Sequence, residues 1–451
     1  MEHKKLERSI GLIGSAATLV GYVVGASIFI LPGELAPSTG PALFVSFLIA
    51  SVPALLSCFV TAQIGCAYPE SGAPYVAASR NLSPFWGFML VWSLLTGATI
   101  GIPLIAYSFA DYLAFFIADV DTKAVALATV AFFAGINLLG ARISVRAQAL
   151  MVAVFVAALL VFGFGGLPHV SLANLTPMFP KGFGAVLGAA IPAYFSFVGF
   201  SMIADLAGEV DRPGWTIPRA LAIAFVCIVF FYTIVPFTLV GIVPWNELGA
   251  MKATVAEAAR LFTPDIVASL ISIGALFAAA TSLNGILLAI SRDVYALAED
   301  RIFPPQLGEL RGRRNMPIAA ILTVAAVGFI GTAVGSTITR YAVAAVMAIM
   351  LLQILSAAAV FALPKRSPER YAKAGFRLPP VWRVVCSVGL ISISLGFIGL
   401  GAAQDPAAAR VFVLLVLLGA GYYGLRKAML RRQGLRIEDV LRKDRALASA
   451  D

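Results

Sequence analysis

Twelve long apolar segments fill almost the whole 451-residue chain, and they decide the solvent in which it can fold. A helix needs roughly 20 predominantly apolar residues to cross the hydrocarbon core of a bilayer, and each segment supplies about that number. Because 60% of the residues are hydrophobic and 12% are charged, the sequence predicts an all-α integral membrane protein with about twelve transmembrane helices. The predicted spans cover approximately 10–35, 41–67, 83–117, 123–140, 145–167, 184–209, 217–243, 265–299, 317–335, 339–363, 381–402 and 408–426.

Lysine and arginine are unevenly distributed between the connecting segments. With a cytoplasmic N-terminus, 27 of the 33 basic residues fall on the inside, and six remain outside: Lys123, Lys181, Lys252, Arg260, Arg340 and Arg410. This positive-inside bias predicts a multi-pass protein of the cytoplasmic (inner) membrane with both termini in the cytoplasm. The net charge of +10 is therefore accounted for by basic residues on the cytoplasmic side of the membrane. It does not indicate a nucleic-acid partner. Residues 1–9 and 427–451 are interpreted as cytoplasmic tails, the second either a basic helix on anionic headgroups or a solvated charged tail.

Two predicted spans contain residues that weaken a helix near the centre of the bilayer. The first span reads "GYVVGASIFILPG" over 21–33, and the sixth reads "AYFSFVGFSMIADLAGEV" over 193–210. Spans one and six occupy corresponding positions if ten spans form two halves, 10–167 and 184–363, followed by two C-terminal spans over 381–426. Five spans per half would invert the second half relative to the first. The sequence therefore predicts a five-plus-five inverted-repeat core with discontinuous helices one and six, an arrangement that builds a transporter binding site at mid-membrane.

A broken span presents unpaired backbone groups at the break. The N–H groups of Ala26, Ser27 and Ile28 could hold a substrate carboxylate, while carbonyl groups near Gly21 or Phe195–Ser196 could accept hydrogen bonds from an ammonium group. A zwitterion would satisfy both sets. The alternative is that the small residues only allow close packing between helices.

The chain also resembles the amino acid–polyamine–organocation (APC) permeases. The family's opening motif matches Gly21, Gly25, Ile28, Phe29, Pro32 and Gly33. Further matches, in the family's order, are "YPESGAPYVAASRNLSPFWGF", "NLTPMFP", "GEVDRPGWTIPRAL" and "SRDVYALAEDRIFPP". The resemblance covers nearly the whole chain and implies alternating access around spans one and six.

The resemblance also implies a substrate pocket in this chain. Its carboxylate site matches the backbone at Gly25, Ala26 and Ser27, and its gating aromatic matches Phe195. The span-six break that meets the amino group matches Ser196, Phe197 and Val198. The remaining predicted substrate-binding positions are Tyr22, Gly97, Gly101, Ser201 and Ile286.

The sequence leaves open whether transport is coupled to a proton, to sodium or to the exchange of substrates. The family commonly has an acidic residue where this chain has Ser201, so Asp205 is the nearest substitute for a proton relay, unless it is a solvated or arginine-paired acid. Thr281 and Ser282, with carbonyl groups near Gly21 and Val24, could instead form a sodium site. The alternative for both hydroxyls is ordinary hydrogen bonding to their own or a neighbouring helix.

Other function classes lack the residues they require. Cys58, Cys66, Cys227 and Cys386 lie in apolar segments and predict neither disulfides nor a metal site. The chain has two histidines and no glycine-rich phosphate loop, so we expect no enzyme, metal or cofactor. The predicted function is a secondary active amino acid transporter. A pocket without a charged side chain favours a neutral substrate. The alternatives are a cationic amino acid, amine or polyamine permease or exchanger, and a transporter-like nutrient sensor. The oligomeric state is not predicted.

Overall fold

The computed structural model describes residues 10–434 apart from 71, 118, 140–144 and 311–315. Within these ranges the chain is helical, as predicted from its apolar segments. The α-helices are α1 Leu12–Val23, α2 Ser27–Thr39, α3 Leu43–Ala67, α4 Ala73–Asn81, α5 Pro84–Leu113, α6 Thr122–Leu138, α7 Val145–Gly166, α8 Gly182–Tyr194, α9 Met202–Asp205, α10 Pro213–Ile242, α11 Thr254–Ala259, α12 Asp265–Glu299, α13 Ile318–Val334, α14 Ile338–Arg366, α15 Pro368–Lys373, α16 Pro380–Gln404 and α17 Pro406–Arg432. Short 3₁₀ turns are η1 Leu167–His169, η2 Leu172–Leu175, η3 Phe195–Phe197, η4 Leu248–Ala250 and η5 Pro305–Gly308.

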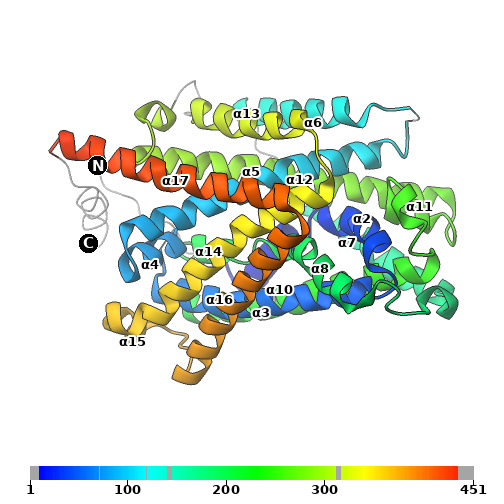
Figure 1. Cartoon of the computed structure of the whole chain (residues 1–451), viewed down its shortest axis with the longest axis horizontal. Coiled ribbons are helices and arrows are strands. Elements are labelled where there is room, and N and C mark those ends of the chain that lie inside the picture. Colours follow the sequence, from blue (N-terminus) through cyan, green and yellow to red (C-terminus); the bar gives the residue numbers. More distant parts are fainter. Residues whose placement is uncertain (1–9, 71, 118, 140–144, 311–315, 435–451) are drawn as a thin grey trace.

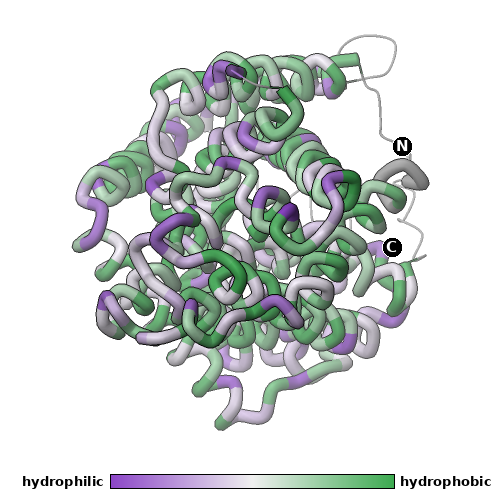
Figure 2. The backbone as a smooth tube through the Cα atoms, turned by 90° about the vertical axis from the view of Figure 1, so that its right-hand side faces the viewer, coloured by the Kyte–Doolittle hydropathy of each residue, from purple (hydrophilic) through white to green (hydrophobic). Residues whose placement is uncertain are grey.

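The described residues contain nine helices long and apolar enough to cross a membrane, or ten if the bent pair α1 and α2 is one span. Two further apolar helices, α6 and α13, have 17 residues each and fall at the fourth and ninth predicted spans. Seventeen residues is the lower limit for a spanning helix. Figure 2 shows hydrophobic residues over most of the helical tube. The all-α membrane fold is thus confirmed.

Several elements occupy corresponding places in the two predicted halves. The first and sixth spans are both interrupted, the third and eighth include the long helices α5 and α12, and the fourth and ninth are the two short helices. The short helices α6 and α13 pack against each other along one edge of the molecule (Figure 1). The C-terminal helices α16 and α17 pack on α14 at the periphery. This order is what two related halves would produce, although the division at 10–167 and 184–363 stays a prediction.

The two interrupted spans are linked to each other at one end. Ile10, just before α1, forms a parallel β-bridge with Val210, just after the second interrupted span. The Ile10 N–H donates to the Glu209 carbonyl at 3.1 Å, and the Asp211 N–H donates to the Ile10 carbonyl at 3.0 Å. These two hydrogen bonds join the start of the first interrupted span to the end of the second.

All four cysteines are free, and the prediction that they are small buried hydrophobic residues holds for three of them but is wrong for Cys227. Cys227 is exposed on α10, whereas the other three are buried. Residues 1–9 and 435–451 lie outside the described residues, so the predicted N-terminal tail and most of the basic C-terminal tail have no structural counterpart here.

Candidate functional site

The first break separates α1 from α2 and bends the span by 41°. α1 ends at Val23 and α2 begins at Ser27, so the predicted break falls at Val24–Ala26. The first amide groups of α2, at Ser27 and Ile28, have no carbonyl one turn earlier in the same helix. Gly25 faces α12 so closely that an added methyl group would lie 2.5 Å from Ser282 Oγ. The absence of a side chain at Gly25 therefore lets the backbone of the break approach α12 closely.

The second break is longer than the sequence indicates. α8 ends at Tyr194, the turn η3 covers Phe195–Phe197, and α9 contains only four residues before the chain turns again over 206–209. The sixth span is interrupted as predicted, but its helical part ends at Asp205, four residues before the predicted end at 209. Gly199 explains part of this, because its φ of +129° is a conformation that residues with a side chain rarely adopt. A methyl group there would lie 2.8 Å from the ring of Tyr22.

Tyr232 on α10 joins the two breaks. Its phenolic oxygen lies 2.9 Å from the carbonyl oxygen of Val23, at the end of α1, and 2.9 Å from that of Ser196, in η3. The Ser27 side chain lies next to the same phenol. A phenol has one proton, so the two carbonyl groups compete for it. Sequence reasoning missed this residue, because a tyrosine within "FFYTIVPF" of span seven looks like any buried aromatic.

The predicted gate residue lies over a predicted pocket residue. A methyl group on Gly101 of α5 would lie 2.9 Å from Phe195 Cζ, so the Phe195 ring packs directly on this glycine. Gly97, one turn earlier, does not share this position. It faces α14, where a methyl group would lie 2.8 Å from Ile349 Cδ1. The structure thus places Gly101 against Phe195, the predicted gate residue, and Gly97 at a contact between helices.

The carbonyl groups predicted to receive an ammonium already accept hydrogen bonds. The Phe195 carbonyl accepts from the Val198 N–H at 3.2 Å, and the Ser196 carbonyl accepts from Tyr232. Each carbonyl has a second lone pair and remains available to a further donor. The Ser196 hydroxyl is different, because it is buried, at 1% exposure, and has no hydrogen-bond partner among the described residues. A buried hydroxyl without a partner is costly, and a ligand in the break could satisfy it.

The two hydroxyls of the predicted sodium site differ in their surroundings. Thr281 donates within its own helix, to Phe277 and Ala278, as the alternative interpretation expects. Ser282 instead faces Gly25 across the interface between α12 and the first break.

The other two proposed ion-binding positions have neighbours of their own. Gly21 faces an apolar neighbour, since a methyl group there would lie 3.2 Å from Val152 on α7. The Val24 N–H is already bonded to the Val20 carbonyl. The remaining predicted residues, Ala26, Ser201 and Ile286, lie on the first break, the second break and α12, respectively.

Asp205 lies near a second acid that sequence reasoning missed. Asp293 on α12 lies near enough to Asp205 for their charges to repel each other, and both carboxylates lie near enough to the Tyr22 phenol to interact with it electrostatically. Within the described ranges, neither carboxylate has a basic partner at ion-pair distance, so the arginine-paired interpretation of Asp205 is not observed there. Asp293 stands within "SRDVYALAED", which resembles an ordinary charged helix end and gives no signal of this proximity.

Two interrupted spans that meet inside an all-helical membrane protein are the arrangement of a membrane transporter.

Comparison with known proteins gives the family. The amino acid permease family matches residues 10–422, and this chain belongs to it. An uncharacterized transporter of Mycobacterium tuberculosis is 27% identical over 442 residues, which cover 95% of this chain and 93% of the relative. The branched-chain amino acid permease BcaP of Bacillus subtilis is 24% identical, with 81% of this chain and 83% of the relative covered. Cationic amino acid transporter 4 of Mus musculus is 29% identical over 70% of this chain and 54% of its own length. The chain is thus a permease-family transporter and not an enzyme.

Proposed function

We propose that this transporter moves a neutral amino acid across the cytoplasmic membrane by alternating access, as a secondary active permease. The observation that carries this proposal is the meeting of the two breaks at Tyr232. Its phenol contacts the last carbonyl of α1 and a carbonyl of η3, while Ser27, at the start of α2, contacts the same phenol. The start of α2, whose amide groups suit a carboxylate, and a carbonyl group that suits an ammonium are therefore both next to one side chain.

The side chains around the breaks favour a substrate with no further charge. The proposed substrate-binding positions carry aromatic, aliphatic, glycine or hydroxyl side chains, and none is charged. A second positive or negative charge on the substrate would have to be buried without a partner there, at a cost of several kcal/mol. Similarity to a protein named as a branched-chain amino acid permease agrees with this choice.

A second candidate rests on the Asp205–Asp293 pair. Two carboxylates that interact with each other and with Tyr22 lie near the first break. A substrate with a second ammonium group, such as a cationic amino acid or a polyamine, could be attracted by them. Similarity to a protein named as a cationic amino acid transporter supports this alternative. The same acids are candidates for a proton-coupling site, whereas Ser282 remains the candidate for sodium.

Competition for uptake distinguishes the two candidates. The purified full chain would be reconstituted into liposomes, and uptake of labelled leucine measured against unlabelled leucine, phenylalanine, arginine, glutamate and putrescine. The neutral proposal expects leucine and phenylalanine to compete at least tenfold better than the charged compounds. If arginine or putrescine competes best and Asp205→Asn removes that competition, the cationic candidate replaces the neutral one. Tight binding without any flux would indicate a nutrient sensor.

The orientation is part of the proposal. Both termini are placed in the cytoplasm because the positive-inside bias requires it. A cysteine introduced at Lys252, between α10 and α12, should react with an impermeant thiol reagent added outside intact cells. A cysteine at Arg80, at the end of α4, should not react.

A further inference from the structure

A deep apolar groove lies on the membrane-facing side of the helical bundle, away from the two breaks. Its volume is about 750 Å³. α5 and α14 form its floor, and α13 and α17 form its two walls. The apolar side chains that line the walls are exposed, with Val327 and Val334 on α13 and Val411 and Leu418 on α17. Because these helices belong to a protein that crosses the bilayer, the medium outside the groove is lipid.

The polar atoms along the length of the groove are already used by the protein. The hydroxyls of Thr96, Thr99 and Thr323 donate to carbonyl groups of their own helices. The Trp92 indole donates to the Leu415 carbonyl at 2.8 Å, and the Tyr422 phenol donates to the Ile302 carbonyl at 2.7 Å. The surface left to an occupant is therefore hydrocarbon, which suits an aliphatic chain.

The groove is long enough for such a chain. On α17 its lining extends from Ala407 to Tyr422, a distance of about 22 Å at ~1.5 Å per residue. The hydrocarbon core of a bilayer is about 30 Å thick. The occupant would thus lie along the membrane normal, as the acyl chains of a phospholipid do.

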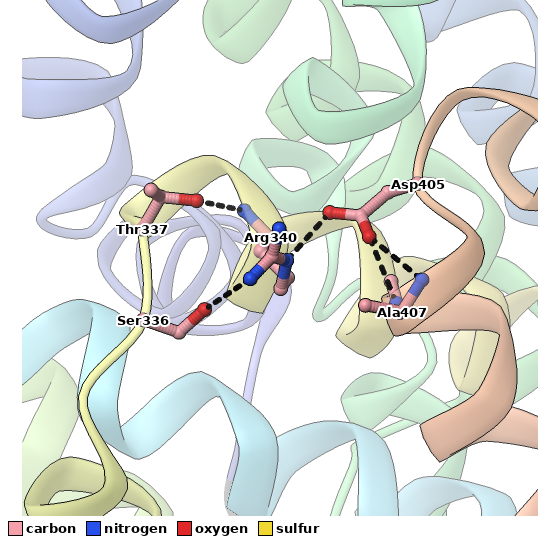
Figure 3. A network of polar contacts seen from close by, with 6 residues as sticks. Ser336, Thr337, Arg340, Asp405 and Ala407 are labelled. Atoms are coloured by element: carbon pink, nitrogen blue, oxygen red, sulfur yellow. Dashed lines mark hydrogen bonds and ion pairs between the residues drawn. The ribbon is translucent and has the colours of Figure 1, made fainter.

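One end of the groove is polar and carries charged side chains of both signs. Arg340 at the start of α14 donates from Nε to Asp405 Oδ2 at 2.8 Å, and Asp405 Oδ1 accepts from the N–H groups of Ala407 and Ala408 (Figure 3). Arg340 Nη1 also lies 3.5 Å from Ser336 Oγ. The guanidinium side chain remains 48% exposed and the carboxylate 20% exposed, so a positive and a negative group are both accessible at the groove end.

We propose that this groove is a binding site for one phospholipid with a zwitterionic headgroup. Its acyl chain lies between α13 and α17 on the floor of α5 and α14. Its headgroup phosphate meets the exposed part of Arg340, and its ammonium lies beside Asp405. An anionic headgroup would match only one member of the Arg340–Asp405 pair, so the paired charges favour phosphatidylethanolamine over phosphatidylglycerol.

Native mass spectrometry of the delipidated full chain tests this site. The protein would be mixed with equal amounts of phosphatidylethanolamine and phosphatidylglycerol with identical acyl chains. We expect one phosphatidylethanolamine retained per chain, at least fivefold more often than phosphatidylglycerol. Val327→Trp should fill the groove and abolish this retention, whereas Leu322→Trp is the matched control, because Leu322 is exposed on the same helix and does not line the groove.

A second pair of variants separates the acyl chain from the headgroup. Ala344→Leu narrows the groove from its floor on α14 and replaces Val327→Trp if that variant does not fold. Arg340→Gln should leave a lipid bound but remove the preference for phosphatidylethanolamine. Equal retention in the wild type, Val327→Trp and Ala344→Leu would overturn the site. A wild-type preference for phosphatidylglycerol would overturn the assignment of its headgroup.

Discussion

The phenolic oxygen of Tyr232 lies 2.9 Å from the carbonyl oxygen of Val23, the last residue of α1, and the same distance from that of Ser196 in η3. One side chain on an unbroken helix thereby contacts both broken ones. Because its single proton cannot satisfy both carbonyl groups fully, this contact can shift between them when the breaks change shape. The position of the phenol makes the two halves of the candidate site dependent on each other.

Tyr232→Phe should therefore impair transport as well as stability. The variant leaves two buried carbonyl groups without their donor, and we expect a loss of about 1–3 kcal/mol in the free energy of unfolding. Uptake and substrate-dependent thermal shift in the purified protein measure the effect. Tyr68→Phe is the control, since that phenol is also buried but bonds Asn81 and Ser367 instead of a break. Equal substrate affinity in the two variants would show that Tyr232 is structural only.

Gly25→Leu should fold but not transport. A methyl group at this position would already lie 2.5 Å from Ser282 Oγ, which a rotation of the serine can relieve, whereas a leucine side chain cannot be accommodated in the same way. Ser27→Ala should have a smaller effect, because its backbone N–H remains. Uptake at matched protein levels checks both variants. Wild-type uptake by Gly25→Leu would exclude a substrate site at this break.

Phe195 should act as a cover over bound substrate. Phe195→Ala should weaken substrate binding by roughly 1–3 kcal/mol, because the ring that excludes water is lost. Gly101→Ala should also interfere, since its methyl group would lie 2.9 Å from Phe195 Cζ and displace the ring. Phe195→Trp keeps an aromatic cover and should retain transport. The comparison is made on binding constants, and unchanged affinity in Phe195→Ala would assign the ring to packing.

The coupling ion can be tested at two separate places. Ser282→Ala, combined with Thr281→Ala, should abolish any sodium dependence of uptake, because a cation site between α12 and the first break would lose its hydroxyl oxygens. Asp205→Asn and Asp293→Asn should instead abolish dependence on a proton gradient. Uptake driven by an imposed sodium or proton gradient distinguishes them. A wild-type protein indifferent to both gradients would point to exchange.

The Arg340–Asp405 ion pair should stabilise the protein in a pH-dependent way. Partial burial acts to raise the pKa of Asp405, but the N–H of Ala408, the Arg340 guanidinium and the N–H of Ala407 together hold that pKa below its ordinary value. A lowered folded-state pKa means that the contribution is complete above about pH 4 and is lost as the pH falls through the folded pKa. Asp405→Asn keeps an N-cap for α17 and removes only the charge.

Thermal unfolding of the wild type and Asp405→Asn measures this contribution. We expect a deficit of roughly 0.2–1 kcal/mol for the variant at neutral pH, since both side chains are partly exposed and solvent screens them. The deficit should be constant between about pH 5 and about pH 8 and should shrink below about pH 4. It should be smaller in an Arg340→Gln background, where the N–H groups of Ala407 and Ala408 still favour the charged carboxylate. A deficit that persists there would come from the helix end and not from the ion pair.

The sequence by itself determined the membrane class, the helical fold and the first break. Long apolar runs have no other stable arrangement in a bilayer, because every backbone group must be hydrogen-bonded within its own segment. The small residues around Gly25 indicated where that bonding fails, and α1 and α2 are separated there. The motifs of the resemblance indicated the family, which the comparison confirmed.

Only the tertiary structure decided which residues meet across the breaks. Residues far apart in the chain meet at Tyr232, at Asp293 and at the Phe195–Gly101 contact. Hydropathy does not predict such contacts, because buried aromatic residues and glycines occur in every span. The sequence also did not indicate that the inner half of span six ends after the four residues of α9. Apolar composition reports how deep a residue lies in the membrane, but the rotation of each helix about its axis, which selects its neighbours, is set by packing against the other helices.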